Sequence, residues 1–155
     1  MGKVLNPLSN IDIDKIMKKH NVKNYRGTYS KDMLPKRING NESVIVNLQD
    51  YFEGEGTHWV VIYNDNNGDS VEYFDSFGLK PPIECINYME TSNKLIEYNS
   101  SQIQNIDSIM CGYYCCFYII ERYKSRQPID ILLDFNQKPS LCNEVFIQDF
   151  ARHIV

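Results

Sequence analysis

The chain has 155 residues, a hydrophobic content of 43% and a net charge of −4, with 16 basic residues against 20 acidic ones. A chain of this size buries roughly two-thirds of its unfolded surface without metals or disulfides, so we expect one domain over residues 1–155. The interspersed charges give no strong nucleic-acid signal. There is no apolar signal core and no run near the ~20 apolar residues of a membrane span, so we expect a soluble, intracellular protein without membrane contacts.

Five cysteines are present, and their number and spacing restrict their chemistry. They stand at positions 85, 111, 115, 116 and 142. The odd number, the lack of a zinc spacing and the lack of a secretion signal predict thiols rather than a metal site or a disulfide scaffold. Cys111, Cys115 and Cys116 would bind a metal only with a distant histidine. We therefore predict no metal, and one reactive thiol.

The first half of the chain predicts one helix and three strands. Residues 11–20 should form a helix capped by Asn10, and its buried face should carry Ile13, Ile16 and Met17. Residues 25–43 are too polar and broken for a long element. Strands are expected over 43–48, 58–64 and 70–77, with the turn-rich sequence DNNGD joining the last two as a hairpin.

The second half predicts an apolar helix at the centre of the domain. A helix from Pro81-Pro82 to about Met89 and a strand over 94–99 precede it. Residues 113–120 are almost wholly apolar, so the helix over 111–124 should be buried, and ERYKSRQP should end it. A last helix is expected over 143–153. The class is therefore α+β, with the central helix packed on a small mixed or antiparallel sheet.

The predicted hairpin brings a histidine and a carboxylate together. Facing residues of an antiparallel pair have a constant index sum, and a sum of 133 puts the hairpin centre inside DNNGD and His58 opposite Asp75. Facing Cβ atoms lie roughly 5 Å apart, which lets an imidazole donate one N–H to a carboxylate. The other ring nitrogen is then available as a base. A bulge or another turn type would shift this register by a residue.

Cys111 begins the apolar helix. If Ser108 or Asp107 caps that helix, Cys111 falls in its first turn, where the helix dipole favours a thiolate. Gly112 would let backbone or substrate approach closely. Each residue also has an ordinary explanation: a buried thiol, a histidine at a strand end, an Asp in a turn. The catalytic interpretation is favoured because three ordinary explanations would otherwise have to coincide.

Three motifs resemble one family. GTHWVVIY, FDSFG and Q-x6-CG-x2-C, which runs from Gln104 to Cys115, are similar to the signature of adenain, the adenovirus maturation protease, and of its relatives in virophages and Polinton-type mobile elements. The similarity covers most of residues 8–125. It implies a papain-like or adenain-like cysteine protease fold. It also implies catalytic roles for four residues: His58 as general base and acid, Asp75 as its orienting carboxylate, Cys111 as nucleophile and Gln104 as oxyanion donor.

The resemblance leaves some assignments open. Gln102 competes with Gln104 for the oxyanion role, and Asn47, Trp59 and Gly112 are expected to line the substrate site. Adenain has Glu in place of the Asp of FDSFG, holds its activating peptide through a cysteine that has no counterpart near Tyr98, and is basic. We therefore expect no required cofactor, because the sequence supports neither an activating peptide nor DNA.

The function that follows is a cysteine endopeptidase of a virophage or mobile element. It would cut capsid and other structural proteins during particle maturation at Gly-containing sites, acting as a monomer in the host cell and packaged in the virion. One alternative is a deSUMOylating or other ubiquitin-like-specific protease, in which the Gln normally lies one residue closer to the Cys. A second alternative is a capsid-associated module of the same fold without catalysis.

Overall fold

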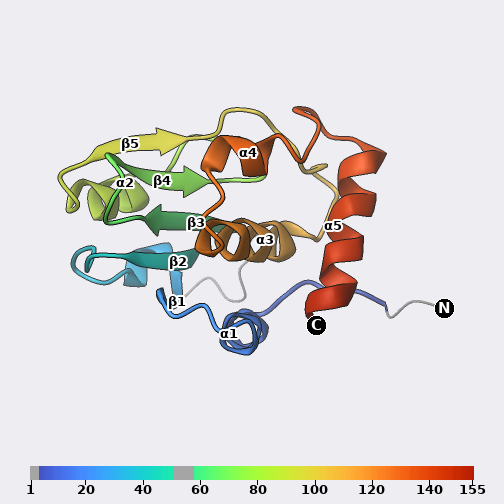
Figure 1. Ribbon diagram of the computed structural model, residues 1–155, viewed down its shortest axis with the longest axis horizontal. Coiled ribbons are helices and arrows are strands. Elements are labelled where there is room, and N and C mark those ends of the chain that lie inside the picture. The colour runs from blue at the N-terminus through green and yellow to red at the C-terminus, as the bar shows by residue number, and fades with distance from the viewer. Residues whose placement is uncertain (1–3, 51–57) are drawn as a thin grey trace.

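The computed structural model describes residues 4–50 and 58–155, and its centre is a five-stranded mixed sheet (Figure 1). The strand order is β1-β2-β3-β4-β5. β2 to β4 form an antiparallel meander, while β1 runs parallel to β2 and β5 parallel to β4. The strands span Tyr25–Ser30, Glu42–Asn47, Trp59–Asn64, Ser70–Phe74 and Leu95–Tyr98. The α+β class and the mixed sheet are as predicted.

β1 contradicts the expectation that residues 25–43 hold no long element. Its residues are only half buried, because it is an edge strand with a neighbour on one side. It therefore lacks the apolar run or the clean alternation by which strands are recognised. The 3₁₀ turn Lys31–Met33 follows it directly.

Helices cover both faces of the sheet. α1 (Asn10–Lys19), α3 (Cys111–Tyr123), α4 (Pro128–Leu132) and α5 (Leu141–Ile154) belong to one side, and Figure 1 shows α3 crossing the middle of the sheet. α2 (Ile83–Glu90) packs on the other side. Alternate strand residues divide accordingly: Ile45, Val61 and Phe74 join the α3 core, and Val44, Ile62 and Tyr73 join the α2 core.

Helix boundaries differ from the predictions near their caps. Ser9, not Asn10, caps α1, and it does so in a capping box with Asp12. α5 begins two residues earlier than expected, behind the cap Ser140. α4 was not predicted, because five residues that begin with Pro128 give too short a pattern to show helical periodicity. Ile13, Ile16 and Met17 are buried as predicted.

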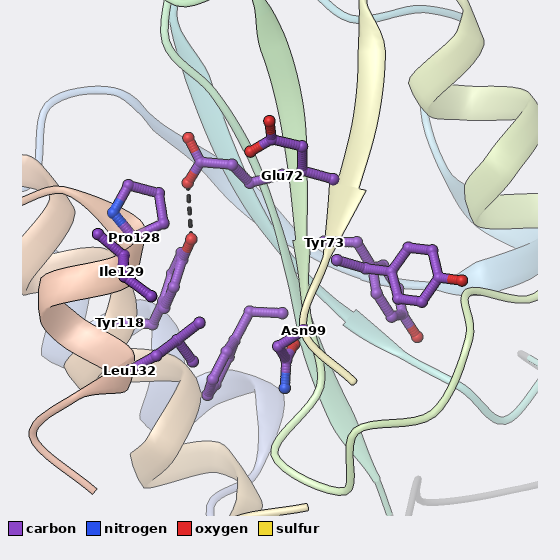
Figure 2. A pocket seen from close by; sticks show the side chains of 10 residues that line it. Glu72, Tyr73, Asn99, Tyr118, Pro128, Ile129 and Leu132 are labelled. Atoms are coloured by element: carbon purple, nitrogen blue, oxygen red, sulfur yellow. Dashed lines mark hydrogen bonds between the residues drawn. The ribbon is translucent and has the colours of Figure 1, made fainter. Parts of the chain in front are cut away.

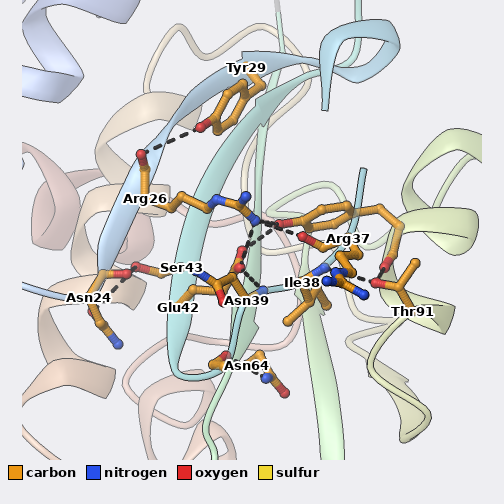
Figure 3. A network of polar contacts seen from close by, with 12 residues as sticks. Asn24, Arg26, Tyr29, Arg37, Ile38, Asn39, Glu42, Ser43, Asn64 and Thr91 are labelled. Carbon is orange, nitrogen blue, oxygen red and sulfur yellow. Dashed lines mark hydrogen bonds and ion pairs between the residues drawn. The ribbon is translucent and has the colours of Figure 1, made fainter. Parts of the chain in front are cut away.

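A network of hydrogen bonds connects α2 to β1 and β2 (Figure 3). The buried carboxylate of Glu42 accepts hydrogen bonds from Arg26 Nη1 at 3.0 Å, from the Asn39 N–H and from the Tyr88 hydroxyl. Arg26 also donates to the Arg37 carbonyl at 2.7 Å. A buried charge is tolerated when it is paired and hydrogen-bonded in this way. The network lies at the end of β2 remote from Asn47, so it stabilises the scaffold.

Within residues 4–50 and 58–155, no helix has the length and apolar character needed to cross a membrane.

Candidate active site

His58 and Asp75 meet at one end of the β3–β4 hairpin. His58 immediately precedes β3 and Asp75 immediately follows β4. His58 Nε2 lies 2.6 Å from Asp75 Oδ1, and the Asp75 side chain is fully buried. A short contact of this kind between an imidazole and a buried carboxylate is a charge-assisted hydrogen bond. The predicted pairing of these two residues is therefore present.

The register of the hairpin differs from the predicted one. The ladder pairs Val61 with Phe74 and Asn64 with Val71, so the index sum is 135 instead of 133. The ladder ends at the pair Val61–Phe74, so His58 and Asp75 both lie beyond it, at the same end of the hairpin. Their contact is made by the segments that flank the two strands, and the predicted direct facing of the two residues is not what brings them together.

Phe77 lies in the turn after β4, and it contacts both members of the pair. Its ring stacks on the imidazole of His58 with centroids 4.2 Å apart and planes inclined by 10°. Its backbone N–H donates to Asp75 Oδ1 at 2.8 Å. The stacked ring limits rotation of the imidazole, while the N–H holds the carboxylate oxygen in place.

Asn99 holds the backbone of Asp75 from the other side. Its Oδ1 accepts from the Asp75 N–H at 3.0 Å and its Nδ2 donates to the Asp75 carbonyl at 2.6 Å. A side-chain amide here replaces the strand partner that Asp75 lacks beyond the end of β4. Asn99 also lines a pocket of about 190 Å³ between β4, β5, α3 and α4 (Figure 2). Asn99 thus connects the wall of this pocket to Asp75, the partner of the imidazole.

The imidazole of His58 is coupled to the thiol of Cys111. Burial lowers the pKa of His58, but hydrogen bonds to Asp75 and Cys111 outweigh this effect and raise the pKa to about 9. Because Nε2 is taken by Asp75, Nδ1 is the ring nitrogen left for Cys111. The imidazole therefore holds its proton at neutral pH.

Cys111 is the first residue of α3, at the positive end of the helix dipole. Met110 is the N-cap, so the expected cap at Ser108 or Asp107 is wrong. Among the described residues no side chain caps this helix, and Ser108 Oγ instead accepts the N–H of Met110 at 3.2 Å. The expected first-turn position of the thiol holds, because the helix begins at Cys111 as predicted.

The other cysteines differ from Cys111 in their surroundings. All five are described, and none forms a disulfide. Burial raises the pKa of Cys85 to about 12 and also raises the pKa of Cys115 and of Cys116, so these thiols stay protonated. Cys142 is exposed on α5. Inert, buried roles for Cys85, Cys115 and Cys116 agree with the sequence interpretation.

The two candidate oxyanion glutamines have different positions. Gln104 is fully buried, with Oε1 2.5 Å from Ser76 Oγ and Nε2 2.9 Å from the Ser108 carbonyl. Gln102 is partly exposed, and its Nε2 donates to the Gln104 carbonyl at 2.9 Å. Gln102 is thus engaged with the backbone of its neighbour. Gln104, whose amide is fixed at both ends next to the residues that precede α3, is the better candidate.

The expected substrate-site residues contact the protein's own N-terminal segment. Trp59 Nε1 donates to the Leu8 carbonyl at 3.1 Å. A Cβ on Gly112 would lie 3.1 Å from the Cβ of Leu8, so the close approach expected at Gly112 is made by Leu8. Asn47 is buried, and its Oδ1 accepts the Gln49 N–H at 2.9 Å. These contacts give all three residues a packing role beside the site, and substrate contact by them remains a prediction.

Sequence reasoning missed three residues that hold the site together: Ser76, Phe77 and Asn99. Ser76 and Phe77 lie within FDSFG, but the motif was used only for its Asp. Both residues lie in the turn after β4, where the alternation of a strand does not apply, so no periodic pattern points to them. Asn99 has no signal, because its contact with Asp75 joins segments 24 residues apart.

The chain is similar in sequence to viral cysteine proteases. No family model matches it. The SUMO-1 cysteine protease S273R of African swine fever virus (isolate Warthog/Namibia/Wart80/1980) is 33% identical over 134 residues, which covers 75% of this chain and 49% of the relative. The putative thiol protease R355 of Acanthamoeba polyphaga mimivirus is 30% identical over 113 residues, covering 64% and 37%. The chain thus spans about half the length of the first of these relatives and less of the second.

Solved structures show the same fold. The crystal structure of the pS273R protease of African swine fever virus superposes with a TM-score of 0.63 at 18% identity, over 90% of this chain and 65% of that one. The central domain of Lpg1148 from Legionella pneumophila gives 0.54 at 15% identity, over 96% of both chains. The fold is therefore the papain-like fold of a cysteine protease. Together with the sequence similarity, it supports a likeness to viral cysteine proteases; the matches do not single out the expected adenain, virophage or Polinton relatives.

Proposed function

We propose that this chain is a cysteine endopeptidase domain in which Cys111 is the nucleophile, His58 the general base and acid, and Asp75 the carboxylate that orients the imidazole. The observation that carries the proposal is the 2.6 Å contact between His58 Nε2 and Asp75 Oδ1, on an imidazole that is also coupled to Cys111. The similarity to viral cysteine proteases supports it.

The chemistry follows from these positions. The thiolate of Cys111 attacks the scissile carbonyl, and the imidazolium of His58 protonates the amine that leaves as the C–N bond breaks, which gives an acyl-enzyme. The neutral His58 then takes a proton from water as the water attacks the thioester, and the Cys111 thiolate leaves, which releases the acid and restores the thiolate–imidazolium pair. Asp75 keeps the imidazole oriented and stabilises its positive charge. Gln104 donates an N–H to the oxyanion of each tetrahedral intermediate.

Cys111→Ala is the direct test of the nucleophile. Cleavage of a Gly-containing peptide should disappear, because the variant lacks the nucleophilic sulfur. The helix should remain folded, because Ala is a good helix former. The matched control is Cys142→Ala, which removes the exposed thiol of α5 and should leave turnover unchanged. Cleavage by Cys111→Ala at the wild-type rate would refute the assignment.

We further propose that the substrates are capsid and other structural proteins of the particle that encodes the chain, cut at Gly-containing sites during maturation. The similarity to proteases of two large viruses supports a viral role, and the adenain-type motifs suggest a virophage or mobile element. The enzyme would then act as a monomer in the infected cell and be packaged in the virion. Incubation of the purified protein with structural proteins of the same genome, followed by mapping of new N-termini, tests this.

A second candidate is a ubiquitin-like-specific protease. It is favoured by the name SUMO-1 cysteine protease that the African swine fever virus relatives carry. The spacing of seven between Gln104 and Cys111 favours the first candidate. Rates on a SUMO-1 fusion and on a Gly-containing peptide, each at equal enzyme concentration, separate the two. Strong preference for the folded SUMO-1 fusion would favour the second.

A further inference from the structure

Ser76 and Gln104 form a buried pair beside the catalytic residues. Both side chains are fully buried, and Ser76 Oγ donates to Gln104 Oε1 at 2.5 Å. Ser76 directly follows Asp75 in the turn after β4. One turn thus carries the carboxylate that contacts the imidazole and the hydroxyl that contacts the candidate oxyanion donor.

The partners of Gln104 determine which end of its amide is nitrogen. The Ser108 carbonyl oxygen can only accept, so the atom 2.9 Å from it must be Nε2. The atom facing Ser76 is then Oε1, to which the hydroxyl donates. Since an amide nitrogen carries two hydrogens, one N–H remains after the bond to Ser108.

The backbone around Gln104 does not depend on the Ser76 hydroxyl. The N–H groups of Ile103 and Gln104 both donate to the Ser76 carbonyl oxygen, at 2.9 and 3.0 Å. Asn143 Nδ2, from α5, donates to the Ile103 carbonyl at 3.0 Å. An Ala at position 76 would keep the carbonyl and all three bonds. The hydroxyl therefore controls the orientation of the side-chain amide and little else.

We propose that Ser76 is a positioning residue that holds the Gln104 amide with an N–H, rather than its carbonyl oxygen, available to the oxyanion. The proposal rests on the cysteine protease function. A rotated amide would present a partial negative charge to a developing negative charge, so it would oppose the reaction that the N–H assists. The Ser76 hydroxyl stabilises the productive orientation by pairing with Oε1.

Ser76→Ala tests the proposal by comparing peptide hydrolysis, which forms an oxyanion, with alkylation of Cys111, which does not. We expect kcat for a peptide substrate to fall at least about tenfold, while KM stays within about threefold of the wild-type value. Removal of a whole oxyanion donor costs roughly 100-fold or more in kcat, and misorientation of the donor should cost part of that loss. Alkylation of Cys111 by iodoacetamide forms no oxyanion, so its rate and pH profile should not change. A kcat within about twofold of wild type would overturn the proposal, as would a shifted alkylation profile.

A double-mutant cycle with Gln104→Leu tests whether Ser76 acts through Gln104. Adding Ser76→Ala to Gln104→Leu should cause less than about a twofold further loss of kcat, since the hydroxyl then has no amide to orient. Losses that multiply would overturn the proposal. The double variant replaces both polar partners with apolar groups, a change that is often nearly neutral for stability, so it keeps the test open if Ser76→Ala alone does not fold.

Ser43→Ala is the matched control. Ser43 is a fully buried serine at the end of β2 remote from the site, and within residues 4–50 and 58–155 its hydroxyl bonds only to the Asn24 carbonyl and side chain, at 3.4 Å. Its kcat should equal that of wild type, and a matching loss in both serine variants would overturn the specific role of Ser76. Active-site titration corrects each rate for the folded fraction. An inactive wild-type protein would refute the proposed function itself, a result distinct from unchanged activity in Ser76→Ala.

Discussion

At the scale of single residues, Asp75 connects the imidazole to the surrounding backbone. Its Oδ1 contacts both His58 Nε2 and the Phe77 N–H, and Asn99 holds its main chain on both sides. A carboxylate constrained in this way presents one oxygen to the ring in a fixed direction. The orientation of His58 therefore depends on the charge of Asp75 and on the turn that carries it.

Asp75→Asn should separate turnover from binding. The neutral amide cannot stabilise an imidazolium and can present an N–H to Nε2, so we expect kcat to fall by roughly 10³–10⁴ with KM within about threefold. Steady-state kinetics on a Gly-containing peptide measure both constants. Asp149→Asn, an exposed acid on α5, is the control and should behave as wild type. Unchanged turnover in Asp75→Asn would mean that Asp75 has only a structural role in the turn.

The raised pKa of His58 predicts a pH-dependent stability. A group with a pKa of about 9 when folded and about 6.5 when unfolded stabilises the fold fully below pH 6.5, and this contribution is lost as the pH rises through 9. The shift corresponds to ~3 kcal/mol of unfolding free energy. Urea unfolding from pH 6 to 9.5 should show the decline. The His58→Ala variant should not show this decline of stability with pH, whereas His153→Ala, which removes an exposed histidine, should show it. An equal dependence of unfolding free energy on pH in the two variants would contradict the assignment of the decline to His58.

At the scale of elements, the turn 75–78 organises the site. It carries the carboxylate, the hydroxyl of Ser76, the ring of Phe77 and then Gly78, whose φ is +70°. A Cβ on Gly78 would lie 2.6 Å from the carbonyl carbon of Ser101, so this turn and the segment before Gln104 touch backbone to backbone. Only glycine permits both the left-handed conformation and the approach.

Gly78→Ala should therefore be costly. The left-handed conformation alone costs an Ala about 1–2 kcal/mol, and the clash with Ser101 adds about 1–3 kcal/mol of overpacking. Gly40→Ala is the matched control, because Gly40 has a φ of +65° but its Cβ would meet nothing closer than 3.7 Å. We expect a loss on the order of 3 kcal/mol at Gly78 and about half of that at Gly40, by urea unfolding. Equal losses would mean that the backbone contact costs nothing.

The elements that sequence patterns predicted are those with strong local signals. α3 is almost wholly apolar, and β2 to β4 are apolar runs separated by turn residues, so each was found with small boundary errors. β1 and α4 were missed. An edge strand with half-exposed polar residues and a five-residue helix owe their form to neighbours in space, which a local pattern does not contain.

At the scale of the whole molecule, charge bears on how the enzyme is activated. DNA binding requires clustered Lys and Arg that displace counterions from phosphates. Here 16 basic residues are outnumbered by 20 acidic ones. Several bases are already paired with acids: Arg26 with Glu42, Lys31 with Glu84, and Arg126 with Asp134. These pairs leave less positive charge available for phosphates.

We expect duplex DNA to raise the rate of peptide cleavage less than about tenfold near physiological salt, equivalent to about 1.4 kcal/mol of transition-state stabilisation. Rates with and without DNA across a salt series provide the measurement. A larger stimulation that declines steeply with salt would reveal a basic patch assembled by the fold, and would contradict the expectation that DNA is not a required cofactor.

The sequence by itself predicted the candidate catalytic residues and their order, and it determined the class of fold, because these depend on local features: motifs of a few residues, apolar runs and turn signals. The tertiary structure decided the hairpin register, the Met110 cap, the contact of Leu8 with Gly112, and the different partners of Gln102 and Gln104. The register and the Leu8 contact arise between segments that are separated in the chain. Their free energies depend on how the two cores pack against the sheet, and no local pattern encodes that packing.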